Sequence, residues 1–254
     1  DMFLELEAPI LWNLPSQAIA TAPQGQLGMG GSYYASMHDQ NFGFFVKQGY
    51  VRLKGRTKND PSLRLGRFEF SDGSEVAISD PSVNYLVQNR ISQRLIGPFG
   101  FTHVGRSFDG GQVTQVVNHV SLTGLVAFPT KGAFSLQGMD TLSHVQFGYI
   151  SGSVPNVNAE KAELTRGFAA YYNDGRKGVL KTDNRPATVR TADTSNISIE
   201  TLGASYVGSK KIGSGKGDLV LWGAGQTGTW GNQRQQAYAY ALESGYQWKN
   251  VAMK

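Results

Sequence analysis

Cysteine is absent from the 254-residue chain, and charged residues make up only 17% of it. Without cysteine, the chain can form neither a disulfide framework nor a thiolate metal site. No run of about 18 apolar residues occurs, which excludes a membrane-spanning helix but leaves spanning by short alternating strands open. The net charge is +5 without a polybasic run. The absence of a polybasic run argues against a nucleic-acid tail, and the positive charge leaves an anionic partner open.

Glycine is abundant, with 32 residues and no collagen-like repeat, which indicates many turns and small strand residues. No signal peptide is visible. The first residues, DMFLELEAP, already alternate like a strand, and the last, QWKNVAMK, resemble the start of another. We therefore expect one partial domain over residues 1–254, truncated at both ends. Residues 9–40 are polar and rich in Gly, Pro and Ser, which predicts a long loop.

Apolar and polar residues alternate with period two along most of the chain, which predicts β-strands. The candidate strands are Met2–Glu7, Phe42–Lys54, Leu63–Ser71, Val113–Val117, His119–Phe128, Leu142–Gly152, Leu164–Tyr172, Ile197–Val207, Asp218–Gly228 and Gln235–Trp248. Short turns such as 213–217 alternate with long connections such as 72–93 and 173–195. This layout is typical of outer-membrane barrels. The predicted fold is all-β, an antiparallel transmembrane β-barrel of which about ten strands are present.

The alternation also predicts which face each residue takes. Arg67 and Glu69 alternate with Phe68 and Phe70, so they line a lumen if the phenylalanines face lipid. A charge on the lipid face costs roughly 2–4 kcal/mol at the midplane, which favours that arrangement. Further apolar-face and polar-face residues follow the same parity. Val120, Leu122, Val126 and Phe128 are predicted outward, His119, Ser121 and Thr123 inward, and Val145, Phe147 and Tyr149 on an apolar face.

Aromatic residues near strand ends resemble the interfacial girdle of a membrane barrel. They are Tyr33, Tyr34, Tyr171, Tyr172, Trp222, Trp230 and Trp248. A water-soluble sheet with one solvated face predicts the same alternation, so a soluble β-sandwich that binds or cuts acidic carbohydrate stays an alternative. One helix of two turns is predicted at Pro81–Arg90 after an Asp80 cap.

Motifs for catalysis or cofactor binding are weak. Gly223, Gly225 and Gly228 match G-x-G-x-x-G, but the residues that follow predict a hairpin connection and not a helix. The histidines lack metal-ligand spacing, and no G-x-S-x-G elbow occurs. The acidic residues at 69, 72 and 75 fit a charged wall and its loop better than a glycosidase pair. We expect no enzyme, no metal and no cofactor.

Two stretches resemble the alginate-export family of outer-membrane β-barrels: LRLGRFEFSDGSE at 63–75 and RLIGPFGFTHVGRSFDG at 94–110. Segments at 200–208, 222–228 and 237–248 also resemble its strands. Phe68 departs from the family pattern, where Gln is usual, and 81–93 is extra sequence. The resemblance implies a monomeric barrel of about eighteen strands in the outer membrane of a Gram-negative bacterium. It also implies a basic, arginine-lined pore that passes an anionic, alginate-like polysaccharide outward.

Carried over by motif, the candidate pore residues are Arg67 and Glu69 of GRFE, Arg94 of RLIG, and Arg106 and Asp109 of GRSFD, with Arg52 added from its polar strand face. If Val113 faces lipid, Arg106 faces inward and Asp109 does not, unless GRSFD precedes the strand. An arginine can hold a carboxylate bidentately, and facing acids would weaken that grip and allow release.

The expected partners are outer-membrane lipid and an anionic polysaccharide or small anions, with no nucleic acid. A general anion or small-solute porin of the same architecture is the alternative reading of the same barrel.

Overall fold

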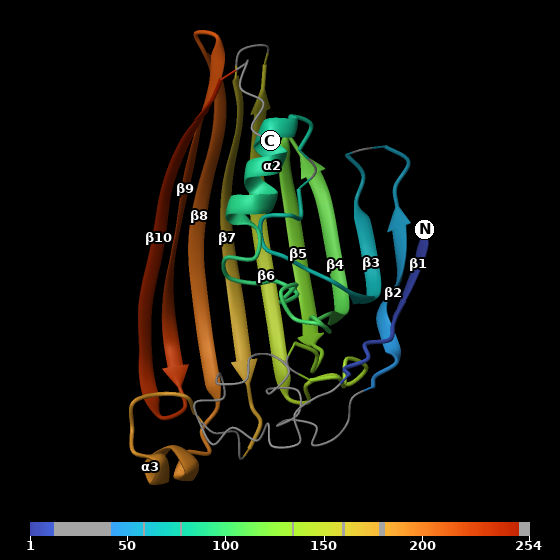
Figure 1. Ribbon diagram of the computed structural model, residues 1–254, viewed down its shortest axis with the longest axis vertical. Helices are drawn as coiled ribbons and strands as arrows, with labels where there is room; N and C mark the ends of the chain where they lie inside the picture. Colours follow the sequence, from blue (N-terminus) through green and yellow to red (C-terminus); the bar gives the residue numbers. More distant parts are fainter. Residues whose placement is uncertain are drawn as a thin grey trace.

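The computed structural model describes residues 1–12, 42–57, 59–76, 78–133, 135–158, 161–177 and 181–248. They form a single antiparallel sheet in which each of ten strands pairs with its neighbour in the chain (Figure 1). The strands are β1 Met2–Glu7, β2 Phe45–Lys54, β3 Ser62–Phe68, β4 Phe108–Val117, β5 Val120–Pro129, β6 Val145–Val157, β7 Lys161–Asp174, β8 Ile197–Ile212, β9 Gly215–Trp230 and β10 Gln233–Gln247. The predicted all-β fold is confirmed, and the sheet is consistent with a partial β-barrel.

A sandwich needs two packed sheets, whereas the described residues form one, so the sandwich alternative is not supported. None of the described helices is both long and apolar enough to cross a membrane. The loop predicted at 9–40 lies, from residue 13 on, outside the described residues.

Connection lengths differ between the two ends of the sheet (Figure 1). Two-residue turns join β4 to β5 at Asn118 and His119, and β8 to β9 at Gly213 and Ser214. Asn118, His119 and Gly213 have positive φ angles of 48°, 70° and 57°, which such tight turns require. The β3–β4, β5–β6 and β7–β8 connections at the opposite end are long, as the sequence predicts. The β9–β10 turn, which lies at the same end as these long connections, is an exception because it is short.

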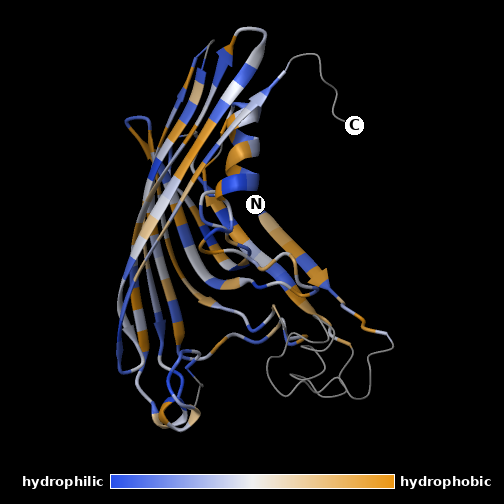
Figure 2. Ribbon diagram, turned by 60° about the vertical axis from the view of Figure 1, so that its left-hand side comes forward, coloured by the Kyte–Doolittle hydropathy of each residue, from blue (hydrophilic) through white to orange (hydrophobic). Residues whose placement is uncertain are grey.

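The connection from β3 to β4 folds back onto the concave side of the curved sheet (Figures 1 and 2). We call residues 69–76 and 78–107 the inner segment. It contains α2 (Pro81–Leu86), which continues into the π-helix η1 (Val87–Ile91) and packs against β7 and β8. The Asp80 side chain accepts a hydrogen bond of 2.9 Å from the backbone N of Val83. The predicted capped helix is therefore confirmed.

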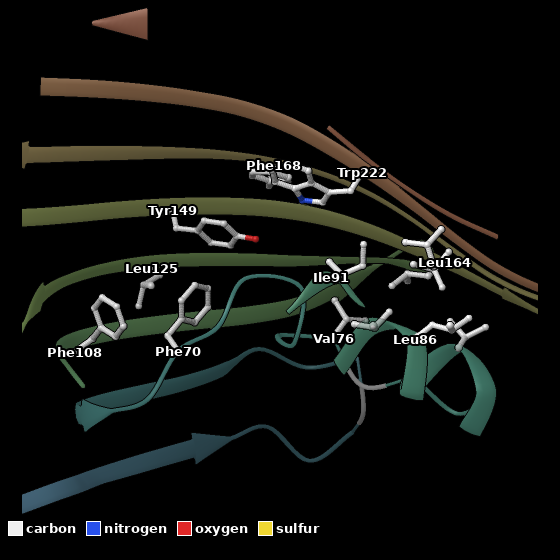
Figure 3. Packing of buried hydrophobic residues seen from close by; sticks show 14 of the residues in the cluster. Phe70, Val76, Leu86, Ile91, Phe108, Leu125, Tyr149, Leu164, Phe168 and Trp222 are labelled. Atoms are coloured by element: carbon white, nitrogen blue, oxygen red, sulfur yellow. The ribbon is translucent and has the colours of Figure 1, made fainter. Parts of the chain in front are cut away.

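The hydrophobic core lies between the inner segment and the concave face of the strands (Figure 3). Phe70, Val83 and Ile91 of the segment are buried against strand residues. The strand residues of this core are Phe68, Phe108, Leu125, Phe147, Tyr149, Leu164, Phe168, Val207, Val220 and Trp222, with Ala127 and Ala162 between them. Apolar residues on the concave face are thus removed from solvent by the chain itself.

This core corrects part of the predicted face assignment. In β5 the prediction is confirmed, because Leu122, Val126 and Phe128 are exposed while Ser121 and Thr123 are buried. In β3 it is wrong, and in β6 the predicted shared face is confirmed but points to the interior. Phe68, at 0% exposure, and the Val145, Phe147 and Tyr149 side chains are buried in the interior. The inner segment offers these residues an apolar surface, so their face need not meet lipid.

The aromatic residues of the predicted girdle differ in their exposure to solvent. Tyr171 and Trp248 are exposed, whereas Trp222 is buried in the core. Tyr33 and Tyr34 lie outside the described residues. In β10, Tyr238 and Tyr240 are exposed on the same parity, which confirms that 235–243 is a strand and not a helix.

Candidate functional site on the concave face

Two arginines face each other on the concave side of β2 and β3. Arg52 stands opposite Arg64, and Arg64 stands opposite Gln112, whose side chain oxygen accepts a hydrogen bond from the Arg64 guanidinium. The Tyr50 ring lies 5.5 Å from the Arg52 guanidinium carbon and 5.3 Å from that of Arg64. Arg64 also lies 4.0 Å from the centre of the Phe68 ring. Like charges in opposite positions are unfavourable, and these ring faces offset part of that cost.

Arg64 is a concave-face residue that the sequence prediction missed. Its neighbours Leu63 and Leu65 point to the opposite face, and Leu65 is exposed there. The Leu-Arg-Leu alternation is the signal that could have found it. Neither Arg52 nor Arg64 has a carboxylate partner within the described part of the chain.

Arg94 lies in the inner segment and reaches across to β10. Its guanidinium donates to the Glu243 carboxylate and to the backbone O of Arg90. Arg90 also contacts Glu243, at 3.2 Å. The Trp222 ring centre is 5.9 Å from the Arg94 guanidinium carbon. One carboxylate therefore faces two arginines at this point, which leaves a net positive charge.

Arg106 lies just before β4, at the long-connection end of the inner segment. Its guanidinium donates to the backbone O of Lys131, at 3.3 Å, and stacks 5.0 Å from the centre of the Phe99 ring. Its Nε is buried without a hydrogen-bond partner among the described residues. Burial lowers the pKa of Arg106, but a guanidinium keeps its charge near neutral pH.

Arg94 and Arg106 line the same cavity, of about 650 Å³, between the inner segment and the strands. Its other lining residues are Gln93, Leu95, Ile96, Gly97, Phe99, Phe101, Phe108, Pro129, Phe147, Ala170, Tyr172, Ile199, Thr201, Gln226 and Trp230. The structure thus brings together two of the predicted site residues, which lie twelve positions apart in the motif RLIGPFGFTHVGR.

Arg67 and Asp109 also come together, but on the other face of the sheet. Arg67 Nε and Nη2 each lie 2.7 Å from a carboxylate oxygen of Asp109, and the two residues are opposite each other in β3 and β4. Phe68 and Phe108, the next pair, point to the concave core. Arg67 and Asp109 therefore lie on the face opposite the concave core, where the predicted parity placed Asp109 but not Arg67.

The Arg67–Asp109 pair is covered by the β5–β6 connection. Arg67 Nη2 donates to the backbone O of Met139 at 2.7 Å, and Asp109 accepts from the Thr141 hydroxyl at 2.6 Å. The hydrogen-bonding groups of Arg67 and Asp109 are therefore occupied by partners within the protein. The arrangement ties a long connection to the end of the sheet.

Glu69 contacts a buried lysine. Lys47 Nζ lies 3.2 Å from the Glu69 carboxylate, 3.9 Å from that of Glu7, and donates to the backbone O of Val104 at 2.6 Å. The β1–β2 register shifts at this position, where Glu5 pairs with Gln48 and Leu6 pairs with Val46. Lys47 is therefore the extra residue of a β-bulge, and Glu69 compensates its charge.

Arg166 of β7 forms the most buried ionic cluster of the described residues. Its Nε donates to Glu75 at 2.9 Å, its Nη2 lies 3.6 Å from Asp72, and its guanidinium also donates to the Tyr149 hydroxyl. Asp72 accepts from the backbone N of Ile96 at 3.0 Å, and burial raises its pKa. Acidic residues at 72 and 75 thus fix the inner segment to the strands, as predicted for a charged wall and its loop.

Glycines 223, 225 and 228 lie inside β9, so no helix N-terminus is available for a dinucleotide phosphate. No group of three or more potential metal ligands occurs among the described residues. The features of this structure that bear on function are therefore the side chains on the two faces of the sheet.

Comparison with protein families matches residues 43–254 to the family described as alginate export. No curated protein matches the chain, and no solved structure does. The family match includes both stretches whose motifs resemble alginate-export proteins, at 63–75 and 94–110, and nine of the ten strands. The chain therefore belongs to the alginate export family.

Proposed function

We propose that this chain forms part of an outer-membrane channel in a Gram-negative bacterium, which passes an alginate-like anionic polysaccharide outward along the concave side of the sheet. The observation that carries this proposal is the opposite chemistry of the two faces. On the convex face, Leu202, Tyr238 and Tyr240 are 70%, 85% and 82% exposed, respectively. Such a surface is favourable against lipid chains and unfavourable in water.

The concave face carries arginines with unsatisfied charge. Arg52, Arg64 and Arg106 have no carboxylate partner among the described residues, and Arg94 shares Glu243 with Arg90. A guanidinium binds a uronate carboxylate bidentately and stays charged near neutral pH. Glu243 beside Arg94 would weaken the grip on the polymer, as release from a conducting site requires.

Of the six residues predicted for the pore, we assign Arg52, Arg94 and Arg106 to its lining, together with Arg64. We assign Arg67 and Asp109 to the attachment of the β5–β6 connection, because their side chains satisfy each other. Glu69 compensates the charge of Lys47. The proposal thus separates arginines that can bind a solute from those already occupied.

Reconstitution of the full-length protein in planar bilayers tests the proposal. We expect an anion-preferring conductance in a KCl gradient, and a reversal potential shifted toward cation preference by Arg64→Glu or Arg106→Glu. Arg234→Glu is the matched control, because Arg234 is exposed near the start of β10, without an ion-pair partner among the described residues. A cation-preferring channel, or no conductance, would contradict the proposal.

Addition of an oligouronate to one side of the bilayer distinguishes polymer passage from a porin for small anions. A polymer that enters the arginine-lined channel should interrupt the chloride current transiently, because it displaces mobile ions while it occupies the lumen. The interruptions should shorten in Arg106→Glu, since one binding charge is lost. A chloride current that oligouronate leaves unchanged would support the small-anion porin.

A further inference from the structure

The cavity between the inner segment and the strands has an aromatic lining that a passage for a hydrated polymer does not require. Six aromatic side chains line it, from the segment and from four strands. They are Phe99, Phe101, Phe108, Phe147, Tyr172 and Trp230. Phe99 and Phe101 pack edge to face with their ring centres 6.0 Å apart, and Phe108 and Phe147 lie 5.9 Å apart. The volume of about 650 Å³ is typical of a small-molecule site.

Two hydrogen-bond donors in this lining are buried and have no partner among the described residues. They are Nε of Arg106 and Nε1 of Trp230. An unpaired buried donor costs about 1–3 kcal/mol, and a carboxylate oxygen of a ligand is the acceptor that would recover the most. Both donors belong to residues that line one cavity, which makes its wall favourable for a ligand that carries hydrogen-bond acceptors.

The charge balance of the cavity selects a monoanion. Of the two arginines that line the cavity, Arg94 is ion-paired with Glu243, which it shares with Arg90 outside the lining, whereas Arg106 has no carboxylate within salt-bridge distance among the described residues. Arg176 also acts electrostatically on Arg106, but Arg176 is itself paired with Asp174 at 2.6 Å. One uncompensated guanidinium therefore remains beside the rings of Phe99 and Tyr172.

We propose that this cavity binds a small aromatic monocarboxylate, with its carboxylate at Arg106 and its ring among the aromatic side chains. The aromatic lining stacks against a planar ring, whereas a uronic acid exposes hydroxyl groups that each need a partner when they leave water. The lining offers few neutral polar groups for them, chiefly Gln93, Thr201 and Gln226. This inference goes beyond polymer passage, although it shares Arg106 with it.

Binding to the full-length protein, folded in detergent micelles, tests the proposal without any conductance measurement. Isothermal titration with benzoate should give a saturable site. Acetate lacks the ring, benzyl alcohol lacks the charge, and glucuronate replaces the ring with hydroxylated carbons. Each should bind at least about tenfold more weakly than benzoate, a difference of one charge pair or one stacked ring. Benzoate should also change the fluorescence of Trp230.

Variants locate the site. Arg106→Gln should weaken benzoate at least about tenfold, and Arg106→Lys should weaken it less, because a point charge remains without the bidentate geometry. Arg234→Gln should leave binding unchanged. Trp230→Phe should remove the fluorescence change and retain a ring. Circular dichroism and the heat-dependent gel mobility of each variant confirm that it is folded.

The rank order of the four probes on the unaltered protein tests the proposal even if Arg106 variants do not fold. Glucuronate that binds as tightly as benzoate would overturn it and make the cavity a sugar site. Absence of benzoate binding, or equal binding by folded Arg106→Gln, would overturn it as well. Channel activity is measured separately, so an anion-selective channel that does not bind benzoate refutes this inference alone.

Discussion

Arg166 is the most buried basic residue among the described residues, with 1% of the residue exposed. It contacts Glu75 and Asp72 of the inner segment, Tyr149 of the neighbouring strand, and the Phe168 ring, whose centre is 4.5 Å away. Removal of a charged group from water is costly, and only a close set of partners offsets it. Arg166 therefore holds the inner segment in place, whereas Arg106 has no such acidic partner among the described residues.

Replacement of Arg166 should destabilise the protein strongly. In Arg166→Met, Glu75 and Asp72 stay buried without a cation, so the free energy of unfolding should fall by about 3–5 kcal/mol. Urea unfolding in lipid vesicles, followed by tryptophan fluorescence, measures it. Lys131→Met removes an exposed pair with Asp140 and should cost less than about 1 kcal/mol. Equal effects would show that burial of the cluster is not the cause.

Asp193, in the β7–β8 connection, should make this connection sensitive to acid. A hydrogen bond from the backbone N of Asn232, then the Arg185 guanidinium, lowers the pKa of Asp193 from 3.8 to about 2. A carboxyl whose folded pKa is depressed stabilises fully above its unfolded pKa, and that contribution is lost as pH falls toward the folded value. The connection should loosen between pH 3.8 and about 2.

Hydrogen exchange at residues 181–196, corrected for intrinsic rates, measures this loosening. Asp193→Asn should reduce the acid-dependent step, because the amide does not titrate in this range, and Asp183, whose pKa the Arg185 guanidinium also lowers to about 2, should account for the step that remains. Asp140→Asn, in the β5–β6 connection, should leave the step in place. Protection that stays constant from pH 4 to pH 2 in the unaltered protein would contradict the prediction.

At the scale of elements, the sequence predicted where strands and helices occur better than it predicted which face of each strand is buried. Alternation located the strands, and Asp80 followed by Pro81 predicted the helix, because both signals are local. The face of β3 was assigned wrongly, and alternation grouped Val145, Phe147 and Tyr149 of β6 on one face without showing that this face is interior. An apolar face packs equally well against lipid or against a covering segment. The sequence marks residues 69–107 as a connection but does not show that it folds back. Phe68 and Tyr149 are buried for that reason.

In the candidate site, too, the sequence predicted some residues correctly and missed the contacts that depend on the fold. Arg94 and Arg106 line one cavity, which the family motif indicated without geometry. Arg67 is turned away from it by strand parity and is held by Asp109, a partner on a different strand. Such a partner becomes visible only when the register of β3 and β4 is known. Arg64 was accessible from the sequence, because leucines flank it on both sides.

Glycines of the G-x-G-x-x-G match in β9 should respond to alanine in a way that reflects strand geometry. Gly228 has φ 137°, and a Cβ there would lie 2.1 Å from the backbone O of Ser198. A Cβ on Gly225 would lie 4.0 Å from the nearest atom, the backbone O of Ala237. We expect Gly228→Ala to lower the free energy of unfolding by about 1–3 kcal/mol and Gly225→Ala to be tolerated. Urea unfolding measures both. A phosphate-binding loop would instead need both glycines.

At the scale of the whole molecule, the sheet is a curved wall with a basic, partly filled interior and an apolar exterior. The inner segment partly fills the interior, and buried aromatic side chains pack between it and the strands (Figures 2 and 3). Arg94 and Arg106 of the segment line the cavity beside this core. β1 and β10 pair with one neighbour each among the described residues, so each presents a free edge within this part of the chain. Edges of this length in lipid must pair, because unpaired backbone groups are costly there.

A charged residue on the convex face should therefore destabilise the protein more, the closer its position lies to the centre of a membrane. Leu202 is 70% exposed near the middle of β8, and Ile212 is 53% exposed on the same face at the end of that strand. Leu202→Arg should lower the free energy of unfolding from lipid vesicles by about 2–4 kcal/mol, and Ile212→Arg by less than about 1 kcal/mol. Titration with urea in vesicles compares the two variants directly. A sheet solvated by water predicts small and equal effects, because an exposed arginine costs little there at any position along the strand. Equal stabilities of the two variants would therefore contradict insertion of this face in a membrane, and a difference in the expected order would place Leu202 near the bilayer centre.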